Sequence, residues 1–163
     1  MARGLVNKPA VLAKILHQLR AELALFTTTA RATHAEATHD ENKAEDKYDT
    51  RGLEASYLAM GQLKQAEEAQ QAVHNFEALP VRAFGPGDAI SLGALVVLES
   101  KGRYCYFIGP RAGGTEVRLD GQTVLVITPQ SPLGRQLMGR KQDDTLQLDP
   151  GGTSSPARIA SVA

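Results

Sequence analysis

The first half of the chain carries an apolar repeat with alternating steps of four and three residues, and this repeat constrains its fold most. Large side chains begin the repeat and smaller ones continue it: Leu12, Leu16, Leu19, Leu23, Phe26, Ala30, Thr33 and Ala37. Such a heptad seam predicts a helix packed along a partner helix. Pro9 suits the first turn of that helix, where a missing N–H costs no hydrogen bond.

A second helical stripe follows, weaker and more polar, and it stops at Pro80. Its members recur at helical spacing: Leu53, Met60, Leu63, Ala66, Gln70, Val73 and Phe76. Two helices of about 30 residues would each span about 45 Å. Because neither helix buries its stripe alone, we predict an antiparallel coiled-coil hairpin over residues 1–80. Thr50 and Gly52 are predicted to break the chain before the second helix.

The second half, from about residue 81, changes to short β-branched runs separated by glycine-containing turns. These runs predict strands over residues 89–98, 103–108, 116–119, 123–128, 145–148 and 158–162. One helical pattern interrupts them, SPLGRQLMGRK, with Ser131 as N-cap and Pro132 at the first helical position. We therefore predict an α+β chain in which residues 81–163 form a mostly antiparallel sheet carrying one short helix.

Charge is segregated in the stretch HDENKAEDKYDTRG, residues 39–52, between the two predicted helices. Carboxylates recur four residues apart and bases do the same, so like charges would neighbour each other on a helix, which is unfavourable. The charged side chains are Asp40, Glu41, Lys43, Glu45, Asp46, Lys47, Asp49 and Arg51. Because the stretch does not serve helix stability, and because the hairpin places it at its tip, it is a candidate functional segment.

Composition excludes several function classes. Acidic and basic residues balance at 18 each, so no overall field favours nucleic acid or an acidic substrate. The single cysteine, Cys105, allows no internal disulfide and fits a reducing compartment. No stretch approaches the roughly 20 apolar residues of a membrane span, and the first residues do not resemble a signal peptide. We expect a cytoplasmic monomer without a membrane partner.

The string ITPQSPLGRQLMGRKQDDTLQLDPGG resembles the C-terminal signature of the Gre family of transcription elongation factors, which includes GreA and GreB. In that family a Ser-Pro-x-x-x-x-Leu-x-Gly-Lys run precedes an acidic pair, a strand and a Gly-Gly turn. The matching positions are Ser131, Pro132, Leu137, Gly139, Lys141, Asp143, Asp144, Gly151 and Gly152. The segment LHQLRAELALF is also similar to the first-helix seam of the family, so the resemblance covers most of the chain.

The resemblance implies a coiled-coil hairpin joined to an FKBP-like domain that docks at the rim of the RNA polymerase secondary channel. The tip would help the polymerase hold a second Mg²⁺ for cleavage of backtracked RNA, so the nascent RNA 3′ end is an indirect partner. The factor would bind no cofactor alone and would not itself be an enzyme. Two-metal chemistry needs carboxylates beside the catalyst, and the charged stretch supplies them.

The tip departs from the family pattern, which is Asp-x-x-Glu followed by Asn-Ala/Ser-Glu/Asp-Tyr. Aligning the helical seams without a gap places Asp46 and Asp49 at the two acidic positions. We predict these two as the Mg²⁺ ligands, with Glu45 as a third catalytic carboxylate. A local alignment that starts at Asn42 has the same spacing but an amide at the first position.

Further polymerase contacts are predicted at the tip and on the short helix. At the tip they are Asp40, Glu41, Lys43, Lys47, Tyr48 and Arg51. On the short helix the predicted polymerase-binding residues are Ser131, Pro132, Leu133 and Arg135. The competing interpretation is structural in both places, namely a solvated connection between helices and a cap that packs a short helix.

Two other functions remain open. An Asp-x-x-Asp tip is also similar to that of DksA, a polymerase-binding regulator that acts chiefly on promoter complexes. The alternative is therefore a non-cleaving regulator of initiation or pausing in the same channel. A prolyl isomerase is suggested only by the FKBP-like half, and such an enzyme needs an aromatic-lined pocket in a chain that has no Trp.

Overall fold

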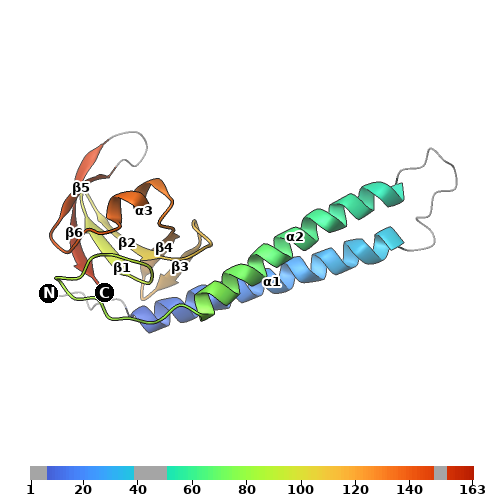
Figure 1. Ribbon diagram of the computed structural model, residues 1–163, viewed down its shortest axis with the longest axis horizontal. Helices are drawn as coiled ribbons and strands as arrows, with labels where there is room; N and C mark the ends of the chain where they lie inside the picture. Colours follow the sequence, from blue (N-terminus) through green and yellow to red (C-terminus); the bar gives the residue numbers. More distant parts are fainter. Residues whose placement is uncertain (1–6, 39–50, 149–153) are drawn as a thin grey trace. The chain divides into compact units, whose positions relative to one another are not determined.

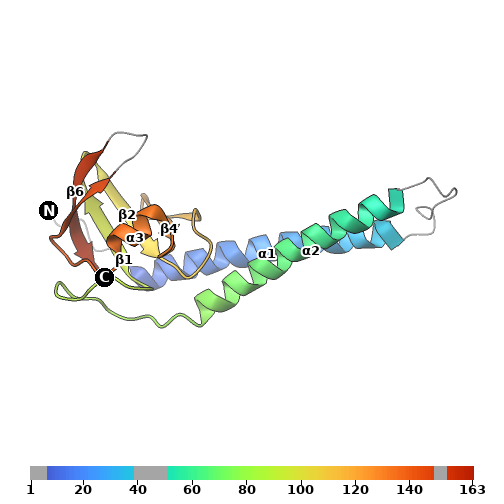
Figure 2. The same ribbon diagram turned by 45° about the horizontal axis from the view of Figure 1, so that its top comes forward.

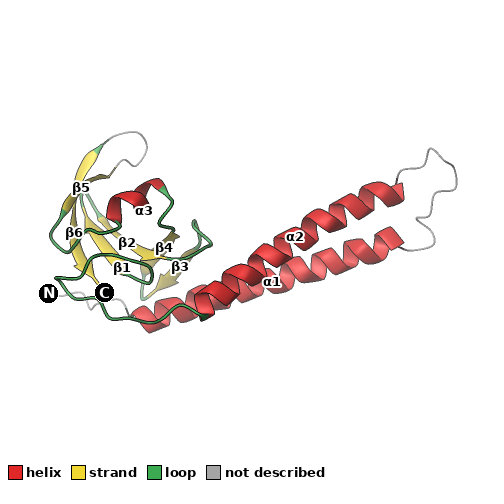
Figure 3. Cartoon of the chain, viewed as in Figure 1, coloured by secondary structure: helices red, strands yellow, loops and turns green. Residues whose placement is uncertain are grey.

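The computed structural model describes residues 7–38, 51–148 and 154–163 (Figure 1). The helices in these ranges are α1 (Lys8–Thr38), α2 (Arg51–Glu77) and α3 (Pro132–Leu137). The strands are β1 (Leu95–Glu99), β2 (Arg103–Ile108), β3 (Glu116–Leu119), β4 (Gln122–Ile127), β5 (Thr145–Leu148) and β6 (Ser155–Val162). The two long helices precede the strands (Figure 3), which confirms the predicted α+β class.

Packing divides the chain into two compact units, which we call the sheet unit and the hairpin unit. The sheet unit is Met1–Leu16 with Asn75–Ala163, and the hairpin unit is His17–His74. The start of α1 and the end of α2 therefore belong to the sheet unit. The predicted domain division at residue 80 stays a prediction.

In the hairpin unit, α1 and α2 lie side by side and run in opposite directions (Figures 1 and 2). Along α1 the predicted seam is confirmed from Leu19 to Thr33, where Leu19 and Ala30 are buried and Leu23, Phe26 and Thr33 are half-buried; the side chain of Ala37 lies outside the described residues. A heptad seam places such residues against the partner helix, which explains why this part of the pattern predicted the packing.

The predicted stripe on α2 is wrong in its first half. Leu53, Met60 and Leu63 are 54%, 65% and 54% exposed, and alanines such as Ala59 and Ala66 are buried instead. Small side chains let two helices approach closely, which leaves the larger neighbouring side chains outside the contact. Gly52 is not a break either, because α2 begins at Arg51 and includes Gly52 in its first turn.

The strands form one sheet in the order β3-β4-β2-β1-β6-β5. Four of the neighbouring pairs are antiparallel and the β2–β4 pair is parallel, which confirms a mostly antiparallel sheet. The turn between β3 and β4 contains Asp120 and Gly121, both with positive φ, as a tight hairpin requires.

The predicted boundaries of two strands are corrected by the structure. β1 starts at Leu95 and not at residue 89, because a turn in which the Ala94 N–H donates to the Ser91 carbonyl precedes it. Gly93 supplies the φ of +87° that this turn needs. β6 starts at Ser155, three residues before the predicted start, because it continues along β5.

Both faces of the central strands are buried, as expected for continuous apolar runs such as LVVL in β1. On one face, Leu137 of α3 joins a core that includes Val96 and Ile108. On the other face, Phe76 at the end of α2 stacks on Phe107, with ring centroids 6.1 Å apart. The helix ends therefore complete the core of the sheet unit.

In the first two turns of α1, the buried face of the helix is not the predicted one. Val11 and Ile15 are fully buried, whereas the predicted seam residues Leu12 and Leu16 are only half-buried. These turns belong to the sheet unit, and Lys14 Nζ donates to the Arg118 carbonyl of β3 at 2.5 Å. The buried side chains of these turns therefore pack within the sheet unit and do not form a seam with a partner helix.

Lys8 holds the start of α1 within the sheet unit. Its Nζ donates to the carbonyl oxygens of Arg82, at 2.5 Å, and Ala163, at 3.1 Å. The amine lies 4.6 Å from the centroid of the Phe84 ring, and the Arg82 guanidinium lies 4.7 Å from the same ring. Burial, and secondly the charge of Arg82, lower the pKa of Lys8 to about 8.

We expect the free energy of unfolding to rise between pH 8 and 10.5 through Lys8. In this window the unfolded chain, with a Lys pKa of 10.5, binds a proton that the folded chain has released, so raising the pH favours folding. Urea unfolding of the wild type and Lys8→Met at several pH values isolates the effect, because the other titrating groups are common to both. If the free energy of unfolding changed with pH in the same way for both proteins, the assigned role of Lys8 would be contradicted.

Candidate functional site

The charged stretch joins two helix ends that lie beside each other. α1 ends at Thr38 and α2 begins at Arg51, and both lie at the same end of the hairpin, which we call the tip end (Figures 1 and 2). The predicted tip residues that lie outside the described residues are Asp40, Glu41, Lys43, Glu45, Asp46, Lys47, Tyr48 and Asp49, and the side chain of Arg51 lies outside them too. Their roles stay predictions.

The described residues offer no competing metal centre. Within them, no group of three or more His, Cys, Asp or Glu side chains is arranged to hold a metal ion. Cys105 is buried, and burial raises the pKa of its thiol to about 11, so this side chain is not poised as a nucleophile.

The predicted cap of the short helix is confirmed. Ser131 Oγ accepts a hydrogen bond from the Gly134 N–H at 3.0 Å and donates one to the Thr128 carbonyl at 2.7 Å. Pro132 follows at the start of α3, where its fixed φ suits a helix. The hydroxyl thus ties the helix start to the end of the preceding strand.

Gly134 is the residue that makes this close packing possible. A Cβ at this position would overlap the Thr128 carbonyl oxygen and lie 2.8 Å from both its carbonyl carbon and Ser131 Oγ. In the pattern Ser-Pro-x-x-x-x-Leu, Gly134 occupies one of the unspecified positions between Pro132 and Leu137. No signal within the helix predicts the clash, because Thr128 lies outside it.

The predicted polymerase-binding residues at α3 differ in their exposure. Pro132 and Arg135 are exposed, whereas Leu133 is half-buried and packs against the core of the sheet unit. Ser131 is half-buried and holds the cap. Pro132 and Arg135 therefore remain available for a partner, and Ser131 and Leu133 orient the helix that presents them.

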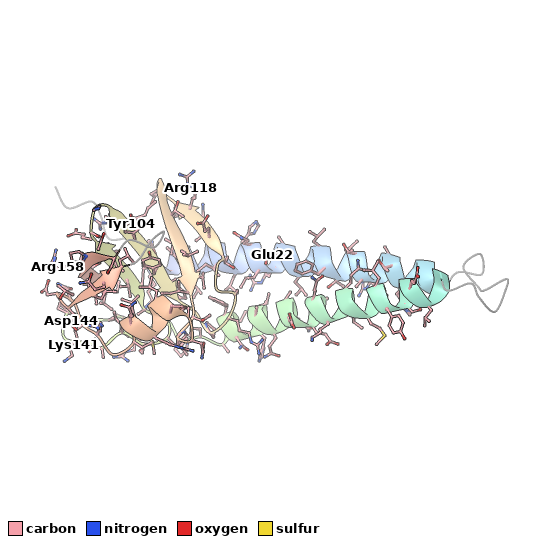
Figure 4. All side chains as sticks on the ribbon, turned by 90° about the horizontal axis from the view of Figure 1, so that it is seen from above. Glu22, Tyr104, Arg118, Lys141, Asp144 and Arg158 are labelled. Carbon is pink, nitrogen blue, oxygen red and sulfur yellow. The ribbon has the colours of Figure 1, made fainter. Side chains whose placement is uncertain are left out.

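The acidic pair after α3 has a structural role. Asp144 Oδ2 accepts from the Lys141 N–H at 2.8 Å, and the Asp144 carbonyl accepts from Ile159 of β6. Asp143, at φ +72°, pairs with Arg158 of β6 at 2.6 Å. Lys141, Asp144 and Arg158 accordingly lie at one side of the sheet unit (Figure 4).

Sequence reasoning missed that Arg158 also pairs with Glu99 of β1, at 3.0 Å. The hydrogen bond to Glu99, followed by the bond to Asp143, raises the pKa of Arg158, which stays charged. Glu99 and Arg158 are opposite each other across β1 and β6. Only the strand register brings them together, so no spacing in the sequence indicates the pair.

No family model matches this chain, and no curated protein matches it. Similar solved structures include the transcription factor Gfh1, at 23% identity and a TM-score of 0.39, with 99% of both chains covered. GreA factor homolog 1 (Gfh1) of Thermus thermophilus is 22% identical, with a TM-score of 0.37 and coverage of 94% of this chain and 93% of that chain. The elongation factor GreA/GreB of Nitrosomonas europaea is 18% identical, with a TM-score of 0.36 and coverage of 67% and 91%.

The chain is similar to these transcription factors. At such identities and TM-scores the similarity is not evidence of function, so the function proposed below rests on residues of this chain. Within the described ranges, no helix is both long and apolar enough to cross a membrane.

Proposed function

We propose that the chain binds RNA polymerase at its secondary channel and stimulates cleavage of backtracked RNA. The observation that carries the proposal is the pairing of two features in one chain. The Gre-like string folds in the order that its family signature requires, with a Ser131-capped helix, a turn at Asp143 and the strand β5. Residues 39–50 of the charged stretch connect the end of α1 to the start of α2, and these two helix ends lie at the same end of the hairpin.

The chemistry would be divided between the two proteins. Asp46 and Asp49, with Glu45, would present carboxylate oxygens to a Mg²⁺ that the polymerase also holds, and such oxygens are the ligands that Mg²⁺ prefers. That ion would supply charge stabilisation and an activated water for in-line attack on the RNA phosphodiester. This chain would contribute positioning, because its carboxylates reach the polymerase site only when the hairpin is inserted.

Docking would rest on the exposed part of α3. Pro132 and Arg135 are the exposed members of the predicted docking set, and Arg135 offers a planar cation for a carboxylate on the polymerase. The hydrogen bonds of Ser131 hold the start of this helix in place. A rigidly presented helix loses less conformational entropy on binding.

The test is a cleavage assay on stalled elongation complexes with end-labelled RNA and Mg²⁺. Adding the protein should release a short 3′ fragment faster than the intrinsic cleavage by polymerase alone, and the shortened RNA should resume elongation when nucleotides are added. An unchanged cleavage rate at saturating protein, with binding shown by co-sedimentation, would refute the cleavage function.

The second candidate is a non-cleaving regulator of initiation or pausing. It is favoured by the Asp46-x-x-Asp49 spacing, in which the second carboxylate is one methylene shorter than in the Gre pattern. Here the protein should shorten the lifetime of open promoter complexes without producing RNA fragments. Unchanged promoter lifetimes at saturating protein would exclude it.

A further inference from the structure

Arg140 lies just beyond the end of α3, and its side chain is half-buried within the sheet unit. Its Nε donates a hydrogen bond to the Gln136 carbonyl at 2.6 Å, and a terminal nitrogen donates one to the Thr145 carbonyl at 3.1 Å. The first carbonyl belongs to the last turn of α3, and the second belongs to the first residue of β5. A single guanidinium therefore joins the end of the helix to a strand.

These two carbonyls occur where regular secondary structure supplies few partners. The last four carbonyls of a helix have no intrahelical donor, and an arginine just past the helix commonly binds one of them. β5 is an edge strand of the sheet, and such a strand carries carbonyls that no neighbouring strand pairs. Because a guanidinium is a planar fork, holding both acceptors fixes the direction of the helix end as well as its distance from the strand.

The main chain around Arg140 is held by a different segment. Gly139 turns the chain out of the helix with a φ of +83°, and its N–H donates to the Ile90 carbonyl at 3.0 Å. The Ile90 N–H in turn donates to the Arg140 carbonyl at 2.8 Å. The turn after α3 is thus bound to the segment before β1, and the Arg140 side chain adds the connection to β5.

The orientation of α3 depends on such contacts at its two ends. The helix has six residues, which is too short for a helix to be stable by itself. At its start, the Ser131 hydroxyl provides the hydrogen bonds beside Pro132. At its end, Arg140 holds the Gln136 carbonyl, and the exposed Arg135 directly precedes Gln136. The side chain that would contact a partner is therefore next to the residue that Arg140 holds.

We infer that Arg140 is a positioning residue for docking on RNA polymerase, in that its guanidinium fixes the end of α3 that presents Arg135. The inference rests on the proposed function and extends it to a residue outside the predicted docking set. Arg140 itself does not contact the polymerase in this arrangement, because both of its hydrogen bonds are made within the chain.

The first test is the affinity of the full chain for RNA polymerase, measured by surface plasmon resonance. Arg140→Met keeps the apolar stem but removes both donors, and it should weaken binding about tenfold because the released helix end must be ordered on binding. Arg140→Lys keeps the charge but has its donors on one nitrogen, so it should also bind more weakly than the wild type. The matched control is Arg118→Met, at an exposed position of β3 on the opposite edge of the sheet from β5, and it should bind as the wild type does.

Two further measurements separate positioning from a loss of stability and from direct contact. In the cleavage assay, the concentration of Arg140→Met that gives half-maximal cleavage should rise about tenfold, while the rate at saturating protein stays that of the wild type, because the charged stretch is unchanged. In the Arg135→Met background, Arg140→Met should weaken binding by less than about threefold, because two residues that act through one contact are not additive.

Near-ultraviolet circular dichroism establishes that each variant is folded under the binding conditions. Wild-type affinity in Arg140→Met overturns the inference, and so does wild-type affinity in Arg140→Lys, which would assign the effect to charge. Fully additive effects of Arg135→Met and Arg140→Met also overturn it, because Arg140 would then contact the polymerase itself. Each of these results leaves the proposed function standing. A wild type that does not bind polymerase refutes the proposed function, and the docking role of Arg140 with it.

Discussion

Replacing Asp46 or Asp49 by Asn should reduce RNA cleavage by stalled polymerase about a hundredfold, because a Mg²⁺ that loses a charged ligand would be displaced, and misplacing a reacting group by an ångström costs that much. The neutral amide keeps the size of the side chain but loses the charge that attracts Mg²⁺. Binding to polymerase should be retained, since the residues proposed for docking on α3 are unchanged. The measurement is the single-turnover cleavage rate at saturating factor and several Mg²⁺ concentrations.

Two further variants sharpen this result. Glu68→Gln removes one exposed carboxylate from α2, away from the charged stretch, and should leave the cleavage rate unchanged. Asp49→Glu restores the chain length of the Gre pattern and should raise the rate if reach limits the wild type. Cleavage that survives in both Asn variants would refute the assignment of Asp46 and Asp49 as ligands.

Gly134→Ala should lower the free energy of unfolding of the sheet unit by about 3 kcal/mol, the upper range for overpacking a rigid site. The new methyl group would overlap the Thr128 carbonyl oxygen, which is backbone and cannot rotate away. Relief requires α3 to shift, and this shift breaks the hydrogen bonds of Ser131. Urea unfolding followed by near-ultraviolet circular dichroism, to which Tyr104 and Tyr106 contribute, measures the loss.

Gly61→Ala is the matched control, and it should raise the free energy of unfolding instead of lowering it. A Cβ at Gly61 meets nothing within 4 Å, and the residue is exposed within α2. Alanine there should stabilise the helix by roughly 0.5–1 kcal/mol, the difference in helix propensity between the two residues. Equal effects of the two substitutions would contradict the packing argument for Gly134.

The parts of the fold that depend on neighbours in sequence could be predicted well. The Ser131 cap, the Pro132 start and the hairpin turn at Asp120 depend on groups within a few residues, and all are confirmed or observed. The bounds of β2 match the prediction for the same reason, since turn residues flank it on both sides. The charged stretch was likewise singled out by its local charge spacing, whereas the choice of Asp46 and Asp49 came from the resemblance to the Gre family and stays a prediction.

The predictions that were wrong concern which face of a helix packs against which partner. The exposed Met60 and Leu63 follow a helical period as faithfully as a core residue does, but the alanine seam of the hairpin leaves them outside. A period identifies a face of a helix without identifying its partner. The exposure of Met60 and Leu63 therefore became visible only in three dimensions.

The sequence by itself determined that two long helices precede a small sheet with one capped helix, because periodicity, caps and turns act over short separations. Only the tertiary structure decided that Val11, Ile15 and Phe76 belong to the core of the sheet unit. The physical reason is that this core joins segments far apart in the chain, as the Phe76–Phe107 stack does. Such burial depends on which distant segments pack together, and a local sequence pattern does not specify those segments.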